Sequence, residues 1–120
     1  MAAFYTVAAK NAMLAGLGAV LVQASLHSEN PGTDGLANEL SGGSPAYARK
    51  VVTLDVPTGG EAALVNDVTF NVPPGSVVKW VGFWNSGGTE FFGAAPVTAE
   101  TYGAQGTYTV PKESAFDMSA

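Results

Sequence analysis

The 120-residue sequence contains no cysteine, one histidine and only five basic residues. The absence of cysteine excludes a disulfide framework, a thiolate metal site and a cysteine nucleophile. The five basic residues are scattered along the sequence and form no stripe that could neutralise a phosphate backbone. Since binding to nucleic acid depends on such a stripe, we expect no nucleic-acid partner.

The sequence also lacks a long hydrophobic run. Its longest apolar stretch, residues 12–22, is shorter than the roughly 20 residues that a membrane-spanning helix needs, so we expect no membrane partner. This stretch has the length of the hydrophobic region of a signal peptide. Only Lys10 precedes it as a basic residue, however, and we expect it to be a structural segment rather than a secretion signal.

Charged residues are scarce as well. They make up 12% of the chain, about half the share that is usual in globular domains. A surface so poor in charge is often partly covered by a partner, which favours an assembled protein. The length itself predicts a single domain, large enough to bury a core without disulfides.

The most informative segment that is present runs from residue 76 to residue 93. Its first part is rich in β-branched and aromatic side chains, with Lys79 as the only charge. Asn85 opens a short Gly-containing break, and Phe91 and Phe92 follow, which is typical of a β-hairpin. Both alternating sets of side chains in the first strand are largely apolar, and we therefore predict a central strand covered on both faces. The two sets are Val77, Val81 and Phe83, and Val78, Trp80 and Trp84.

Other runs with period-two alternation predict further strands, separated by turn signals at intervals of about ten residues. They cover residues 20–27, 47–56, 62–65, 68–72, 91–92, 96–102 and 106–110. The prolines within this region lie at the boundaries of these runs, where proline is tolerated. The sequence thus predicts a mainly β fold: a small antiparallel β-sandwich or jelly-roll-like domain of seven to eight strands with an N-terminal helix.

Three parts are expected along the chain: a helix or arm (residues 1–18), the β-sandwich domain (19–110) and a C-terminal tail (111–120). The first part is rich in alanine, a strong helix former, and Gly16 and Gly18 are expected to end the helix. One helix face carries Phe4, Val7, Leu14 and Leu17. Two interpretations remain open: a helix packed on its own sheet, or an arm that docks on a neighbouring subunit.

Few residues suit catalysis. The single histidine, His27, ends a predicted strand, and no G-x-S-x-G motif supplies a serine partner. One histidine is also insufficient for a zinc site, so we interpret His27 as a strand-end or core residue. Residues 28–44 form an unusually long loop whose acids, Glu29, Asp34 and Glu39, could bind calcium but lack the spacing of an EF-hand. A solvated loop is the alternative that we favour.

Trp84 lies at the predicted hairpin tip. It is expected to pack in the core, with stacking on a sugar as the alternative. We predict no catalytic residue, no metal site and no cofactor, and hence no enzymatic activity. The C-terminal tail is polar except for two residues that resemble anchors. The candidate partner contacts are Phe4, Val7, Leu14, Trp84, Phe116 and Met118.

Five sequence blocks together resemble a family of small virion proteins from tailed phages of actinobacteria, which are labelled tail fibre, minor tail or capsid-associated proteins. The blocks are AAKNAML at residues 8–14, SLHS at 25–28, GGSPAYAR at 42–49, VGFW at 81–84 and YGAQGTY at 102–108. The resemblance covers nearly the whole chain except its last ten residues.

This resemblance implies a non-enzymatic structural protein of the virion. The expected role is an accessory decoration or minor capsid protein that binds the major capsid protein on the particle surface. The alternatives are a minor tail or tail-fibre component bound to tail proteins, and a module that contacts host-surface carbohydrate. Such proteins commonly form symmetric homo-oligomers, so a trimer or another cyclic assembly is expected.

Overall fold

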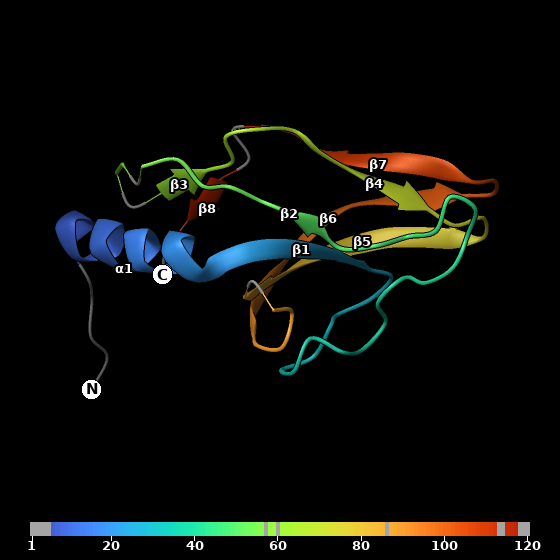
Figure 1. The fold of residues 1–120 in the computed structure, drawn as a ribbon, viewed down its shortest axis with the longest axis horizontal. Coiled ribbons are helices and arrows are strands. Elements are labelled where there is room, and N and C mark those ends of the chain that lie inside the picture. Colours follow the sequence, from blue (N-terminus) through green and yellow to red (C-terminus); the bar gives the residue numbers. More distant parts are fainter. Residues whose placement is uncertain (1–5, 57, 60, 86, 113–114, 118–120) are drawn as a thin grey trace.

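The structure is a computed structural model that describes residues 6–56, 58–59, 61–85, 87–112 and 115–117 (Figure 1). It confirms a mainly β chain with one N-terminal helix. The elements in order are α1 (Val7–Val20), β1 (Leu21–His27), β2 (Lys50–Val51), β3 (Glu61–Ala63), β4 (Val68–Val72), β5 (Ser76–Asn85), β6 (Phe91–Tyr102), β7 (Gly106–Val110) and β8 (Ala115–Asp117).

The strands form three antiparallel groups. The main sheet has four strands in the order β2-β1-β5-β6, and β4 pairs with β7 while β3 pairs with β8. The predicted hairpin is confirmed as β5 and β6, since Trp84 pairs with Phe91 across the turn. The predicted central position is confirmed too, because β5 has β1 on one side and β6 on the other.

The hydrophobic core lies between the main sheet and the β4–β7 pair. Ala24 and Leu26 of β1 pair with Phe83 and Val81 of β5, so the four side chains share one face of the sheet. Alternate residues of β4 are buried, as the period-two pattern of that strand predicts. The buried cluster consists of Ala24, Leu26, Leu40, Val52, Leu64, Val68, Phe70, Val72, Val78 and Val81.

The prediction that Val78 and Val81 of β5 lie on opposite faces of the sheet is wrong. The register shifts between Val78 and Trp80, so the strand carries an irregularity at Lys79. Across this shift one residue of β5 lies opposite three residues of β6, and the alternation of β5 changes there, so that Val78 and Val81 both reach the same core instead of opposite faces.

Two strand boundaries also differ from the prediction. Residues 47–56 do not form one strand: the regular part is β2, and Leu54 makes an isolated bridge to Leu64. Conversely, residues 91–102 form one strand that passes through Pro96, so this proline does not lie at a boundary. An edge strand tolerates proline because one of its sides has no ladder to maintain, and β6 is the last strand of the main sheet.

The helix begins where Thr6 caps it, since the Thr6 Oγ1 accepts a hydrogen bond of 3.1 Å from the Ala9 backbone N–H. It continues to Val20 and leads directly into β1, so the predicted stop at Gly16 and Gly18 is wrong. Glycine weakens a helix interior by about 1 kcal/mol but ends a helix only where it adopts a left-handed conformation, and neither residue does so. Figure 1 shows α1 extending from the main sheet on the side where β3 and β8 lie.

The segment predicted as a C-terminal tail forms β8 within its described part. Phe116 pairs with Ala62, which ties this segment to β3.

Candidate functional site

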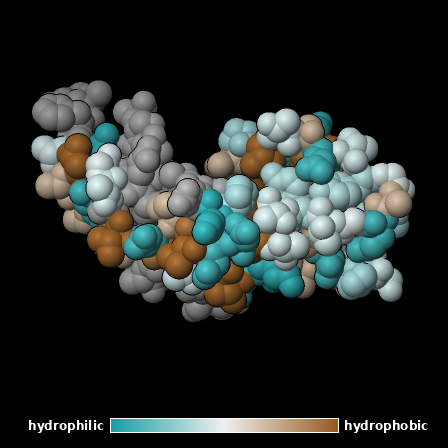
Figure 2. Space-filling view, turned by 90° about the horizontal axis from the view of Figure 1, so that it is seen from above, coloured by the Kyte–Doolittle hydropathy of each residue, from teal (hydrophilic) through white to brown (hydrophobic). Residues whose placement is uncertain are grey.

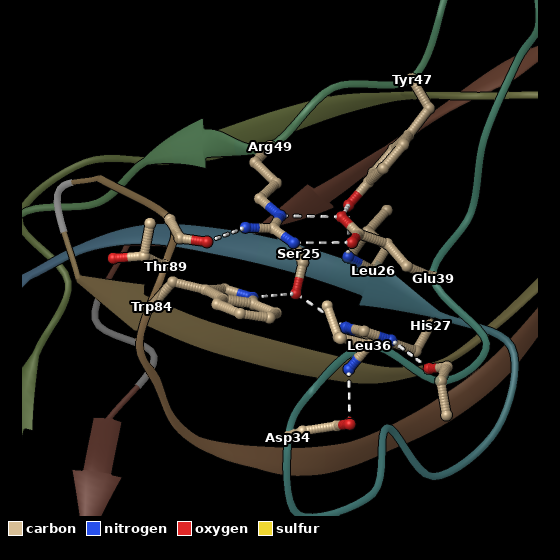
Figure 3. Close-up of polar contacts among 12 residues, drawn as sticks. Ser25, Leu26, His27, Asp34, Leu36, Glu39, Tyr47, Arg49, Trp84 and Thr89 are labelled. Carbon is tan, nitrogen blue, oxygen red and sulfur yellow. Dashed lines mark hydrogen bonds and ion pairs between the residues drawn. The ribbon is translucent and has the colours of Figure 1, made fainter.

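The face of the main sheet that points away from the core carries a buried polar network. Ser25 and His27 alternate with the core residues of β1, and both side chains have no exposed surface. Trp84 is 2% exposed and lies beside them. The segment between β1 and β2 covers this face, and Figure 3 shows how its residues reach the network.

The hydrogen-bond partners together with the neutral state of the His27 ring define the direction of the bonds among Ser25, His27 and Trp84. The His27 Nδ1 lies 2.9 Å from the Ala37 carbonyl oxygen, which can only accept, so Nδ1 carries the proton. Burial lowers the pKa of His27 and keeps the ring neutral, which leaves Nε2 as an acceptor. The Ser25 hydroxyl donates to Nε2 over 2.7 Å, and the Trp84 Nε1–H donates to the same hydroxyl oxygen over 2.8 Å.

Ser25 and His27 have the separation of a nucleophile and its general base. Three observations argue against catalysis. Neither side chain reaches solvent, and the Ser25 oxygen already accepts a bond from Trp84. There is also no room for a reacting group, since a Cβ added at Gly82 would lie 2.6 Å from Ser25 Oγ and 3.0 Å from His27 Nε2. The pair therefore holds the covering segment to the sheet, and the interpretation of His27 as a core residue is confirmed.

A second polar cluster joins the covering segment to the Trp84 ring. The Arg49 guanidinium donates to both Glu39 carboxylate oxygens over 3.0 and 2.9 Å, and the Tyr47 hydroxyl donates to one of them over 2.7 Å. Burial alone would favour the protonated carboxyl, but these hydrogen bonds outweigh it and lower the pKa of Glu39. The Arg49 Cζ lies 3.8 Å from the centre of the Trp84 ring, which is a cation–π distance.

The side chain of Gln105 brings two distant sequence blocks together. Its Oε1 accepts a hydrogen bond from the Ser44 backbone N–H over 3.1 Å, and its Nε2 donates to the Pro45 carbonyl over 3.0 Å. The blocks GGSPAYAR and YGAQGTY thus meet at this amide, while Arg49 of the first block meets Trp84 of VGFW. The sequence reasoning missed these roles, because nothing in the local pattern reveals a partner some 60 residues away.

Replacing Gln105 with alanine is expected to lower the free energy of unfolding by about 1–3 kcal/mol, since each of the two lost hydrogen bonds contributes about 0.5–1.5 kcal/mol. Urea unfolding of the purified variant measures this change. The exposed Thr101→Ala in the adjoining strand is the control and should change stability by no more than about 0.5 kcal/mol. Equal effects of the two substitutions would show that Gln105 does not anchor the turn.

The predicted partner-contact residues fall into three groups. Trp84 is buried, so its favoured position in the core is confirmed, while the alternative of sugar stacking and its place among the candidate partner contacts are wrong for this fold. Val7, at the start of α1, is 53% exposed and available for contact. Phe4 and Met118 lie outside the described residues, as do the side chains of Leu14 and Phe116.

The acids of the long loop are engaged within the fold. Glu29 forms an ion pair with Lys79 over 2.7 Å, and Asp34 Oδ1 accepts a bond from the Leu36 backbone N–H. Across the part of the chain that the structure describes, no cluster of three or more histidine or acidic side chains could hold a metal ion.

The helix α1 combines an apolar composition with exposed side chains. Lys10 and Asn11 are its only polar residues, yet Val7, Ala8, Ala12, Met13 and Ala15 are exposed. Figure 2 shows hydrophobic surface over this end of the molecule, while much of the opposite end is hydrophilic or neutral. A helix that is apolar on all sides is normally buried, yet these five described side chains of α1 are exposed.

No protein-family model, curated protein or solved structure matches this chain. Among the described residues, no helix is both long and apolar enough to cross a lipid bilayer.

Proposed function

We propose that this chain is a non-enzymatic structural protein of a tailed-phage virion, and specifically an accessory decoration protein that binds the major capsid protein. The observation that carries the proposal is the exposed, almost uncharged helix α1, which extends from a β body whose polar network is closed to substrates. The resemblance of five sequence blocks to small phage virion proteins supplies the biological setting.

The architecture supports an accessory role. The buried and half-buried polar side chains fasten the covering segment to the main sheet, and Ser25 and His27 have no exposed surface. We propose that the strands form a jelly-roll-like sandwich that displays α1 as an arm. On the virion, α1 inserts into a neighbouring subunit of the capsid lattice, and the chain associates as a trimer or another cyclic oligomer.

The copy number of this chain in purified virions tests the proposal, by quantitative mass spectrometry against the major capsid protein. A number comparable to that of the major capsid protein is expected for decoration. A few to a few dozen copies would place the chain in the tail, as a minor tail or fibre component. Absence from particles would overturn a structural role altogether.

The double substitution Ala8→Glu and Ala12→Glu tests the arm. Both positions are exposed on α1 and glutamate is a good helix former, so the isolated chain should unfold within about 0.5 kcal/mol of the parent. Binding to particles, measured by co-sedimentation, should fall at least tenfold because the charges would be buried at the contact.

The matched control for the arm is Thr33→Glu, an exposed position in the loop between β1 and β2. It adds a negative charge to the same chain and should leave co-sedimentation unchanged. If the arm variant binds as the parent does, α1 is not the docking element.

A further inference from the structure

Residues 28–38, called the strap below, cover the polar face of the main sheet. Their side of the sheet is opposite to β4 and β7 in Figure 1. Pro31 and Gly35 are buried there, and Gly35 packs directly on Trp84 and Phe91. The strap is held by hydrogen bonds from Ser28 N–H to the Asn38 carbonyl, from Leu40 N–H to the Leu26 carbonyl and from the His27 ring to the Ala37 carbonyl. The exposed ion pair between Glu29 and Lys79 also joins it to β5.

From this arrangement we propose that the strap is an acid-released cover, with His27 as the group whose protonation releases it. In the closed state the neutral His27 ring uses both nitrogens, one donating to the strap and one accepting from Ser25. The bond to Ala37 is the contact through which a change at the ring reaches the strap.

Protonation of the His27 Nε2 would turn this nitrogen from a hydrogen-bond acceptor into a donor. The new Nε2–H would face Ser25 Oγ, which already accepts the Trp84 Nε1–H. The Ser25 hydroxyl proton would lose its acceptor, and a buried donor without an acceptor is costly. A positive charge would also be placed on a ring with no exposed surface. Opening of the strap removes both penalties, because it admits water to the ring.

The charged groups around His27 come from the segment beyond the strap. The negative charge of the Glu39 carboxylate raises the pKa of His27, and the positive charge of the Arg49 guanidinium lowers it. These two groups form an ion pair with each other. Tyr47, which donates to Glu39, remains neutral in this pH range because burial raises its pKa. Burial of the ring is the dominant influence, and the pKa of His27 is lowered from its ordinary value of 6.5.

The sign of the effect follows from linkage. A group whose pKa is lower in the closed state than in the open state stabilises the closed state above the open-state pKa, and this stabilisation is lost as the pH falls. The strap should therefore loosen as the pH drops below about 6.5. Glu39 stays ionised through this range, since its pKa is lowered from 4.5.

The release is local because the strap lies apart from the hydrophobic core. The core cluster is on the opposite face of the main sheet, and β4 with β7 needs no residue of the strap for its ladder. The strap has no regular strand and buries few side chains, which is typical of a segment that opens separately from the rest of the fold.

Hydrogen exchange of the full-length chain between pH 7.5 and pH 5.5, corrected for intrinsic rates, tests the proposal. The Trp84 indole N–H and the Ser28 backbone N–H should lose about tenfold in protection over this range. This is the factor expected for an open-state pKa near 6.5 when the closed state stays unprotonated. The backbone N–H groups of Phe70 and Tyr108, in β4 and β7, should keep their protection.

His27 is the only histidine, so its NMR titration is unambiguous and gives a second readout. A His27→Gln variant keeps a neutral polar side chain and should make the protection of the Trp84 indole N–H independent of pH. An unchanged protection in the parent chain, an equal fall at Phe70 and Tyr108, or a His27 pKa of 6.5 or higher in the folded protein would each overturn the proposal. These parent-chain results decide it even where the variant does not fold.

Discussion

Replacing Trp84 with alanine is expected to lower the free energy of unfolding by about 3–5 kcal/mol, the usual cost of removing a large buried aromatic side chain. The ring is 2% exposed and contacts both the Arg49 guanidinium and the Phe91 ring, whose centroid is 5.0 Å away. Its loss would leave a cavity beneath the strap and remove the donor to Ser25. Urea unfolding followed by circular dichroism measures the change.

Two variants separate the contributions of the Trp84 ring. Trp84→Phe keeps an aromatic ring but removes the N–H donor, so its cost should lie well below that of alanine. Phe92→Ala removes an aromatic side chain that is 36% exposed, and it should cost less than half as much as Trp84→Ala. A Trp84→Ala variant within 1 kcal/mol of the parent would contradict the buried position of this side chain.

Replacing Gly35 with alanine is expected to lower stability by about 2–5 kcal/mol. The residue has a φ of 74°, and a side chain in this left-handed conformation costs about 1–2 kcal/mol. A Cβ would also overlap the Phe91 ring and approach Trp84 Cζ2 to 2.8 Å, which adds an overpacking cost of about 1–3 kcal/mol. The strap would have to lift from the sheet to accommodate it.

Gly32→Ala is the matched control for Gly35. Its φ of 78° is nearly the same, but its Cβ would meet neighbours only at 3.8 and 4.0 Å. It should therefore show the backbone cost alone, and the difference between the two variants measures how tightly the strap packs on Trp84 and Phe91. Equal unfolding free energies for the two variants would mean that the strap does not press on these rings.

The local pattern of the sequence was sufficient for several elements. The predicted strands at residues 68–72 and 106–110 agree with β4 and β7, because alternating side chains and adjacent turn residues define both their faces and their ends. The burial of Trp84 and the core position of His27 were also favoured from composition and placement, since neither residue had a partner motif for chemistry.

Other features depended on contacts that no local pattern contains. The irregularity at Lys79 reversed the faces of β5, and α1 continued through two glycines that were expected to end it. The pairing of β5 with its neighbouring strands outweighs the local alternation of its side chains. The packing of α1 alongside β3 outweighs the weak tendency of glycine to end a helix.

The sequence by itself determined a mainly β chain with an apolar N-terminal helix and a central aromatic hairpin, because period-two alternation and turn chemistry act between residues close in the chain. The tertiary structure alone decided which polar groups meet: Ser25 with His27 and Trp84, Glu39 with Arg49, and Gln105 with Ser44. A buried polar group must find a partner wherever the fold brings one, and that partner can come from any distance along the chain.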